Sequence, residues 1–268
     1  MLRWAVFTFY FIFCIHANAH HLHDRNQTIV IGYAENWAPY SYTASDGTPQ
    51  GIFIQLMNKI FNEKLKLKII HQVVPWKRAQ ILTQTGQYDA IFTSINQERL
   101  KTMVASQAFY NLEWRLFMSK TNYNFKNIQQ MDDPLKNKDV HYLSVLGDQT
   151  TENFYRDNNL TFDTVKSVNE AVNMLNSGRS SLFLHSKLTT LYALYHFSLH
   201  EQIAMHSKTF ATIPFHVLIS KKAAMANELI KAVDEVVTQL KKSGELEKFI
   251  EMIEEKEITR VLEKSNLN

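Results

Sequence analysis

Several polar residues stand at the predicted ends of strands and helices, where side chains and backbone groups are free to bind a small molecule. Thr93 and Ser94 end a predicted strand and can offer hydroxyl and backbone donors. Gln149 and Thr150 come just before a helix predicted to begin near Thr151, and the free N–H groups of a helix start suit an anion. An N-cap role for Thr150 or Thr151 explains the same pattern equally well. Both interpretations stay open at this point.

Acid–base chemistry has two candidates in the sequence. Glu35 follows the first predicted strand and His185 ends a later one, and a general acid or base is a group of this kind held in a cleft. No catalytic motif surrounds either residue, so we predict no catalytic residue. Three histidines near the N-terminus could bind a metal, but a solvated tail explains them better, and we predict no metal site and no cofactor. These histidines are His20, His21 and His23.

Strands alternate with helices along the chain, which predicts an α/β fold with parallel strand pairing. Apolar and β-branched runs predict strands at 28–34, 65–74, 88–93, 114–119, 140–146, 181–185 and 215–220. Apolar residues at helical spacing predict helices at 52–61 and 75–85, from 151 onward, from 168 to Gly178, and at 224–242 and 245–262. Pro75 suits the first position of its helix, and Gly86 suits the end. The polar stretch 124–138 predicts irregular or short helical structure.

The N-terminal segment 1–19 has the three parts of a secretory signal peptide. Arg3 gives the positive start, an apolar run follows over residues 4–15, and the small-residue pattern at 17–19 marks a cleavage site. The apolar run is shorter than the roughly 20 residues that span a bilayer. We therefore expect a soluble exported protein that begins at His20, located in the periplasm of a Gram-negative cell.

Charge and cysteine content exclude further classes of function. The 268-residue chain carries a formal net charge of +3, and removal of Arg3 with the signal segment leaves +2 (3 − 1). Such a small bias predicts no nucleic-acid partner and no binding to an anionic membrane surface. The one cysteine, Cys14, lies in the signal segment, so the mature protein cannot depend on disulfides and must be stabilised by packing.

Four stretches of the sequence, in this order and spacing, resemble the family-3 extracellular solute-binding proteins, the periplasmic amino-acid receptors of ABC importers. The stretches are 31–40 with Gly51; 86–92 running to Glu98 and Arg99; 147–152 with 176–179; and 214–222 with 242–244. The resemblance covers essentially the whole mature chain. It implies a type II periplasmic binding protein, a two-lobed α/β clamshell with two crossover strands. Lobe one would comprise residues 27–115 and 208–268, and lobe two residues 116–207, with ligand in the cleft between them.

The resemblance assigns aromatic contacts with the ligand to the first lobe. Trp37 stands where the family places a ring against the ligand, although a core tryptophan under the turn is the alternative. Tyr40 is a weaker candidate, because packing explains it equally well. Trp76 lies thirteen residues before Asp89, the spacing at which the family has an apolar contact residue, and Arg78 stands beside it. A helix-start anchor with solvated charges is the alternative for this pair.

The resemblance also assigns the charged contacts, and here the chain departs from the family pattern. Arg99 corresponds to the arginine that grips a ligand carboxylate through two parallel hydrogen bonds, with a surface arginine as the alternative. Its spacing from Asp89 is shorter than in typical amino-acid receptors. Ser186 falls where those receptors carry an aspartate that pairs with the ligand's ammonium group, and a hydroxyl cannot supply that charge. Either Glu35 takes this role or the ligand lacks an ammonium group.

We therefore expect a monomeric periplasmic receptor, without enzymatic activity, that captures a small carboxylate-bearing solute. The resemblance implies an amino acid or a relative as ligand and an ABC permease of the inner membrane as partner. Two alternatives remain. One is an enzyme on the same scaffold, resembling cyclic-acid dehydratases, and the other is a ligand-sensing partner of a membrane signalling protein.

Overall fold

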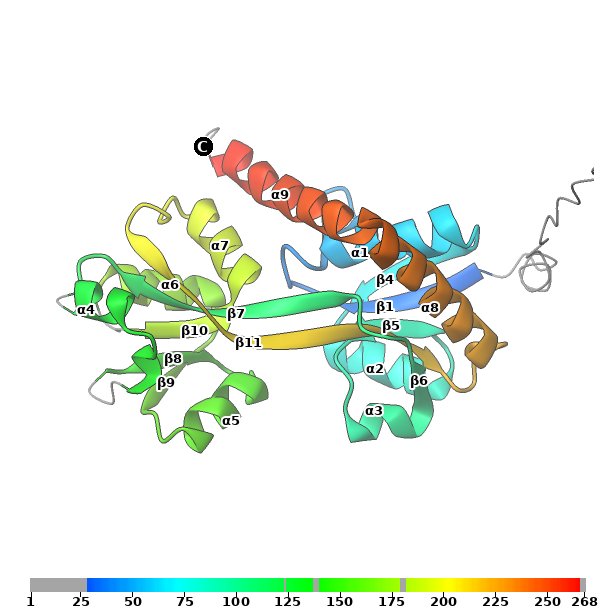
Figure 1. Cartoon of the computed structure of the whole chain (residues 1–268), viewed down its shortest axis with the longest axis horizontal. Helices are drawn as coiled ribbons and strands as arrows, with labels where there is room; N and C mark the ends of the chain where they lie inside the picture. The colour runs from blue at the N-terminus through cyan, green and yellow to red at the C-terminus, as the bar shows by residue number, and fades with distance from the viewer. Residues whose placement is uncertain (1–27, 123, 137–139, 179–181, 266–268) are drawn as a thin grey trace, which may run out of the picture.

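Two long antiparallel strands, β7 (Tyr110–Ser119) and β11 (Ile203–Ser220), run between two α/β lobes (Figure 1). This computed structural model describes residues 28–122, 124–136, 140–178 and 182–265. Within these ranges nine strands form one continuous sheet in the order β4-β1-β5-β11-β7-β10-β8-β9, with β6 beside β11, and two further strands form a separate hairpin. The chain therefore has the two-lobed fold with two crossover strands that the sequence predicts.

Lobe one is built on the parallel strands β4 (Lys68–Val74), β1 (Thr28–Ala34) and β5 (Ala90–Thr93), followed by antiparallel β11 and the short β6 (Met103–Ala105). A small hairpin, β2 (Tyr42–Thr43) and β3 (Pro49–Gln50), precedes the first helix. Helix α1 (Ile52–Met57), its π-helical continuation (Asn58–Lys64) and α8 (Ala226–Ser243) lie on one side of the sheet. Helices α2 (Trp76–Thr85) and α3 (Gln97–Thr102) lie on the other side (Figure 1).

Lobe two places β10 (Leu182–Ser186) antiparallel to β7, followed by the parallel strands β8 (Tyr142–Val145) and β9 (Phe162–Val165). Its helices are α4 (Phe125–Gln130), a 3₁₀ turn (Pro134–Lys136), α5 (Gln149–Asp157), α6 (Val168–Asn176) and α7 (Lys187–His196). Fully buried Phe117, Leu143 and Phe183 belong to a core cluster of this lobe. Lobe two thus has an apolar core cluster of its own.

Most predicted elements are confirmed, and the differences have local causes. Gly86 ends α2 in the left-handed conformation with φ 82°, as predicted, whereas Pro75 is the N-cap and the helix begins at Trp76. Strand β11 is much longer than the predicted 215–220, because its first half is mostly exposed or half-buried and is held by pairing with β7 rather than by burial. The sequence interpretation also omitted α7, which follows β10 directly.

The lobe boundaries and the N-terminal segment remain as sequence predictions. The lobe boundaries at 115/116 and 207/208 stay a prediction, and they fall within β7 and β11. The proposed signal segment, with Cys14 and the three histidines, lies outside the described residues. In the part of the chain that the structure describes, no helix is both long and apolar enough to cross a membrane.

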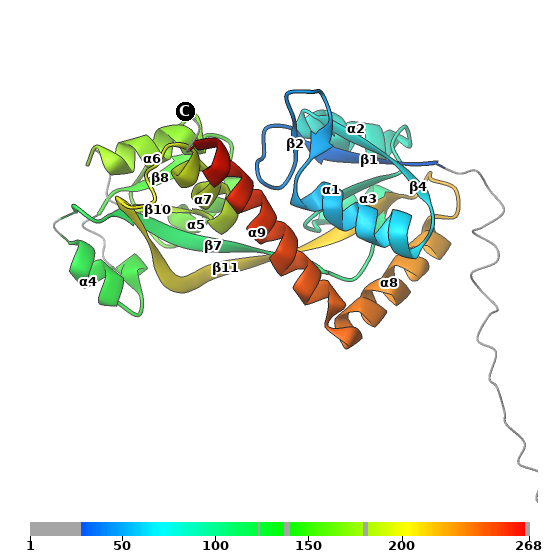
Figure 2. The same cartoon turned by 90° about the horizontal axis from the view of Figure 1, so that it is seen from above.

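The last helix, α9 (Glu245–Ser265), runs from lobe one across the crossover strands and packs against α7 of lobe two (Figure 2). Glu257 is buried with 1 % of its surface exposed. Its carboxylate accepts hydrogen bonds from the Tyr42 hydroxyl at 2.8 Å and the Gln55 amide at 3.0 Å, and it pairs with Arg260 at 3.3 Å. Because a buried carboxylate is costly unless paired, this cluster fixes α9 to the first lobe.

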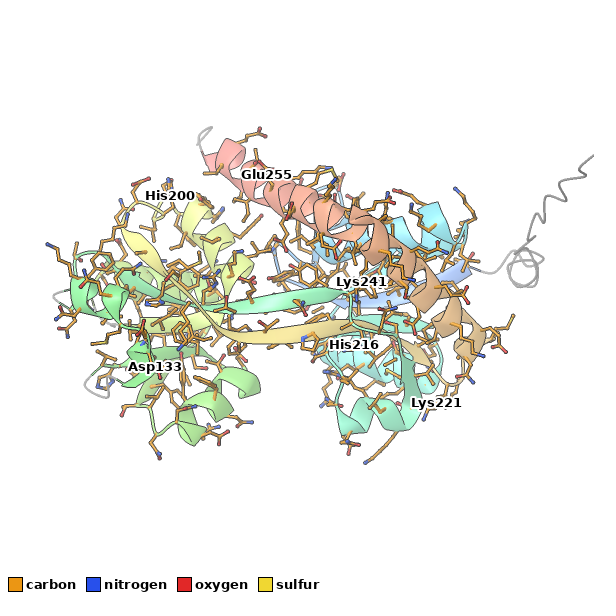
Figure 3. All side chains as sticks on the ribbon, in the orientation of Figure 1. Asp133, His200, His216, Lys221, Lys241 and Glu255 are labelled. Carbon is orange, nitrogen blue, oxygen red and sulfur yellow. The ribbon has the colours of Figure 1, made fainter. Side chains whose placement is uncertain are left out.

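We expect Glu257→Ala to lower the free energy of unfolding by about 2–4 kcal/mol, because it leaves Tyr42, Gln55 and Arg260 without their acceptor. Glu255, which is exposed on the same helix (Figure 3), gives a matched control, and its alanine variant should change stability by less than about 0.5 kcal/mol. Urea denaturation followed by circular dichroism measures both. Equal stability of the two variants would show that the buried cluster does not hold α9.

Candidate functional site

A cavity of about 470 Å³ lies between the lobes, and its walls come from both of them. The crossover strands contribute Leu112, Trp114, Ile213 and Phe215. Six of the residues predicted from the sequence as ligand contacts line it together: Glu35, Trp37, Trp76, Thr93, Ser94 and Ser186. These residues come from four separate stretches of chain, which the fold brings together around one cavity.

Trp37 belongs to both the core and the cavity wall. A tight turn after β1 holds it, with the Trp37 backbone N–H donating to Ser41 O at 3.0 Å and Trp37 O accepting from the Tyr40 N–H at 2.8 Å. Its ring lies 5.5 Å from Phe53, edge to face, and 6.0 Å from Phe215. The core and ligand-contact interpretations of this tryptophan are therefore compatible, since one side packs and the other faces the cavity.

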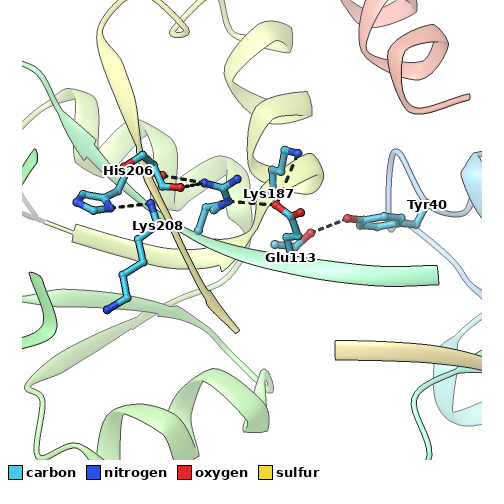
Figure 4. A network of polar contacts seen from close by, with 8 residues as sticks. Tyr40, Glu113, Lys187, His206 and Lys208 are labelled. Atoms are coloured by element: carbon cyan, nitrogen blue, oxygen red, sulfur yellow. Dashed lines mark hydrogen bonds and ion pairs between the residues drawn. The ribbon is translucent and has the colours of Figure 1, made fainter. Parts of the chain in front are cut away.

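Tyr40 lies beneath Trp37 with 1 % of its surface exposed, and its hydroxyl reaches the second lobe. The Tyr40 and Ser186 hydroxyls are 3.0 Å apart, and Ser186 is itself 3 % exposed at the start of α7. Figure 4 shows Tyr40 pointing toward Glu113 and Lys187, whose carboxylate and ammonium lie 3.7 Å apart. Burial raises the pKa of Tyr40 well above its ordinary value, so the hydroxyl stays protonated. The hydroxyl pair of Tyr40 and Ser186 is a direct polar contact between the lobes.

The short helix α3 that carries Arg99 is held at both ends. At its start, the Asn96 side chain accepts a hydrogen bond from the Arg99 backbone N–H at 2.8 Å. At its end, the ammonium of Lys221, a residue labelled in Figure 3, donates to the carbonyls of Leu100 and Lys101 at 2.9 and 3.1 Å. These caps satisfy the free backbone groups of a helix too short to be stable alone. They also fix where Arg99 stands relative to the cavity.

The Arg99 guanidinium lies just behind the cavity wall. It donates to Ser94 O at 2.7 Å and to the Gln80 side-chain oxygen at 3.2 and 3.3 Å, and it lies over the Trp76 ring at 5.4 Å from the centroid. Burial lowers the pKa of Arg99, which remains a cation because arginine starts from so high a value. Ser94 and Trp76 line the cavity, so Arg99 contacts two of its walls without lining it.

The structure adds Asp148 to the site, which sequence analysis omitted. Asp148 lines the cavity and is the N-cap of α5, where its carboxylate accepts from the Thr151 N–H at 3.2 Å and from the Thr151 hydroxyl. The N-cap role suggested for Thr150 or Thr151 is therefore wrong, and the helix begins at Gln149. An aspartate three residues before a helical threonine was the signal that could have identified this cap.

His185 stands beside Asp148 in the same wall, with its Nε2 atom 4.0 Å from the Asp148 carboxylate. Its ring stacks on Phe183 at 4.9 Å and faces Trp114 at 6.4 Å. Burial lowers the pKa of His185 below its ordinary value, although the nearby aspartate opposes this effect. This lowered pKa favours the neutral imidazole.

The remaining predicted residues lie at the margin of the site. Glu35 is exposed at the cavity wall, whereas Arg78 is exposed on α2 and does not line the cavity. The backbones of Gln149 and Thr150 begin α5, but their side chains lie outside the described residues. Of the sequence-predicted contacts, Tyr40 and Arg99 lie directly behind the wall rather than in it.

Comparison with known proteins gives one family over most of the chain. The model of the bacterial extracellular solute-binding proteins, family 3, matches residues 29–253. The last turns of α9, from residue 254 onward, lie beyond the matched part. No curated protein matches the chain.

Solved structures share the fold at low sequence identity. An ancestral cationic amino-acid solute-binding protein is 21% identical, with a TM-score of 0.69 over 88% of this chain and 99% of that one. A second structure describes that ancestral protein as a precursor of cyclohexadienyl dehydratase. An amino-acid ABC transporter substrate-binding protein from Streptococcus pneumoniae, bound to L-arginine, is 21% identical, with a TM-score of 0.64 over 86% and 96% of the two chains. A histidine kinase sensor domain is 15% identical, with a TM-score of 0.61 over 86% and 97%.

The contact between the Tyr40 and Ser186 hydroxyls can be measured by a double-mutant cycle. We expect Tyr40→Phe and Ser186→Ala each to lower the free energy of unfolding, and the double variant to lose about 1 kcal/mol less than the sum, because the two hydroxyls satisfy each other. Phenylalanine keeps the ring that stacks on Phe53 at 5.0 Å, so packing is preserved. Strictly additive losses in urea denaturation would contradict the pairing.

Proposed function

The chain belongs to family 3 of the bacterial extracellular solute-binding proteins, and from this premise we propose a receptor that captures a small carboxylate-bearing solute for ABC import. The expected solute is an amino acid or a relative. One observation supports the proposal above the others, namely a cavity whose walls come from both lobes and from the strands that join them. A solute in that position contacts both halves at once.

Such a solute would bias a hinge movement toward the closed form. Contacts with both lobes exist only when the lobes are together, so a ligand that makes them stabilises the closed state relative to the open one. The walls carry what a small solute needs, namely aromatic area from Trp37 and Trp114 and hydroxyl groups from Thr93 and Ser94. The permease would then bind the closed form in preference to the open one.

We propose that the carboxylate of the solute docks on the lobe-one side, at Thr93 and Ser94. Arg99 supplies the positive charge from behind this wall, since its guanidinium already holds Ser94 O at 2.7 Å. A planar guanidinium can donate two parallel hydrogen bonds to a planar carboxylate, which makes it suited to this role. The Gln80 side-chain oxygen accepts from Nε and Nη2 of Arg99, and a carboxylate that bound these two donors would displace it.

Transport is the finer part of the proposal. The similar protein bound to L-arginine is described as an ABC transporter substrate-binding protein, which supports an inner-membrane permease as partner. Segment 1–19, as a signal peptide, would deliver a monomeric protein to the periplasm. Two other similar structures are a histidine kinase sensor domain and a precursor of a dehydratase. The test below therefore also distinguishes a sensor and an enzyme from a transport receptor.

A thermal-shift screen of residues 20–268 against amino acids, polyamines and organic acids, followed by calorimetry, tests the proposal. We expect a carboxylate-bearing solute to bind and to be recovered unchanged, and Arg99→Ala to weaken it by tenfold or more. A hydrogen bond to a charged group contributes about 1.5–3 kcal/mol, and about 1.4 kcal/mol is a factor of ten. Lys77→Ala, which removes an exposed charge next to Trp76, should change affinity by less than about twofold.

Each other outcome of this screen has a distinct meaning. Conversion of the solute to a product would show that the protein is an enzyme and would contradict the receptor function. Binding that is equally strong in Arg99→Ala would contradict the carboxylate model while leaving the receptor intact. Binding without uptake through any permease, together with binding to a membrane kinase, would favour a sensor.

A further inference from the structure

A second cavity, of about 580 Å³, adjoins the first, and we propose that it receives an anionic group at the far end of the solute. The inference rests on the proposed function and deepens it by naming the class of solute. The solute is an elongated molecule with a carboxylate for lobe one and a second anionic group, a carboxylate or a phosphonate, for lobe two. Lys166 and Thr189 then determine specificity at that end.

The two cavities share part of their walls. Four residues line both of them: Asn36, Trp37, Val145 and His185. Beyond these, the second cavity is walled by Ala38 of lobe one and, in lobe two, by residues 166–169 before and within α6 and by one side of α7. Each cavity alone has a volume typical of a site for a small molecule. A solute that occupies both is therefore longer than one that fills the first cavity alone.

The second cavity differs from the first in the sign of its charge. Among the described residues that line it, Lys166 has a permanent charge and none is acidic, whereas Glu35 and Asp148 line the first cavity only. The nearby Glu170 carboxylate accepts from the Lys166 backbone N–H at 2.7 Å and does not line the cavity. Because Arg99 stands behind a wall of the first cavity and Lys166 lines the second, a solute with one anionic group in each cavity is attracted by both.

The Thr189 hydroxyl on α7 is an unused donor in this cavity. Thr189 lines the cavity and is 9 % exposed, and within the described residues its Oγ1 atom has no hydrogen-bond partner. A helical threonine often bonds a carbonyl of the preceding turn, which Thr189 does not. The next residue, Thr190, is also buried, but its hydroxyl lies 3.3 Å from Nδ1 of His185. A buried hydroxyl without a partner is costly, and an anionic oxygen of the solute would accept from it.

The start of α6 supplies further donors. Ser167 is the N-cap, and its hydroxyl accepts from the Glu170 N–H at 3.2 Å. Val168 and Asn169 follow it and line the cavity, and N–H groups of a first helical turn have no acceptor within the helix. Together with the positive end of the helix dipole, such groups favour an anion. Helix α5, by contrast, begins with the Asp148 carboxylate, so α6 is the better placed of the two for an anion.

The test uses two variants and one control, all as residues 20–268. Lys166→Gln removes the charge of an exposed side chain. Thr189→Val removes the hydroxyl and keeps the shape, and because that hydroxyl is unpaired, the change leaves no other described group without a partner. Lys126→Gln is the matched control, since Lys126 is exposed on α4 of the same lobe and lines neither cavity. Thermal melting checks that each variant is folded.

Calorimetry then compares probes that differ in the second anionic group alone. L-2-aminoadipate is paired with L-norleucine, and suberate with octanoate, because the second member of each pair lacks the terminal carboxylate. L-2-amino-5-phosphonopentanoate offers a phosphonate at the same end. The ratio of the two affinities within a pair measures recognition of the second anionic group.

We expect at least one dianionic probe to bind wild-type protein tenfold or more tightly than its monoanionic partner. Lys166→Gln should lower this preference about fivefold or more and Thr189→Val about threefold or more, with Lys126→Gln within about twofold of wild type. Tighter binding of the phosphonate or of the dicarboxylates identifies which anion the cavity takes.

An equal affinity for both members of each pair would overturn the inference, and so would a preference that is unchanged in either variant. If none of the dianions binds while another solute of the wider screen does, the inference fails and the receptor function stands. If no solute binds in either experiment, both fail together.

Discussion

The ladder between β7 and β11 joins the two lobes, with Ile203 opposite Ser119 at one end and Phe215 opposite Tyr110 at the other. Its register slips twice along the way, and such irregularities let a ribbon bend and twist. Two strands paired in this way tie the lobes together yet leave a space beside them. Helix α9 adds a second tie, because it begins in lobe one and packs against α7 of lobe two.

The chemistry of the cleft follows from that arrangement. Each crossover strand sends aromatic side chains into the space, with Trp114 from β7 and Phe215 from β11. Lobe one brings a guanidinium to one end through α3, and lobe two brings a carboxylate to the other through the cap of α5. The proposed closure would therefore place a solute between chemically different groups of the two lobes.

Patterns of apolar residues were sufficient to predict most of the fold, because buried strands and amphipathic helices each leave a characteristic spacing of apolar residues in the sequence. The first half of β11, which is mostly exposed or half-buried, could not be predicted in this way, since it is held as a strand by pairing with β7. The same limit applies to the site. Trp37, Trp76 and Ser186 were predicted and do line the cavity, but Asp148 was hidden as an ordinary helix cap. That Arg99 stands behind the wall depends on contacts between α2 and α3, which spacing along the chain does not reveal.

Closure of the cleft over a solute can be measured directly across its rim. Ile95, next to Ser94 on lobe one, and Leu146 on lobe two are 45% and 70% exposed. Residues 20–268 contain no cysteine, so Ile95→Cys and Leu146→Cys can carry a pair of spin labels alone. We predict that a solute shown to bind by calorimetry shortens the distance between the labels measured by electron resonance. Saturating binding with an unchanged distance distribution would contradict a receptor that closes on its ligand.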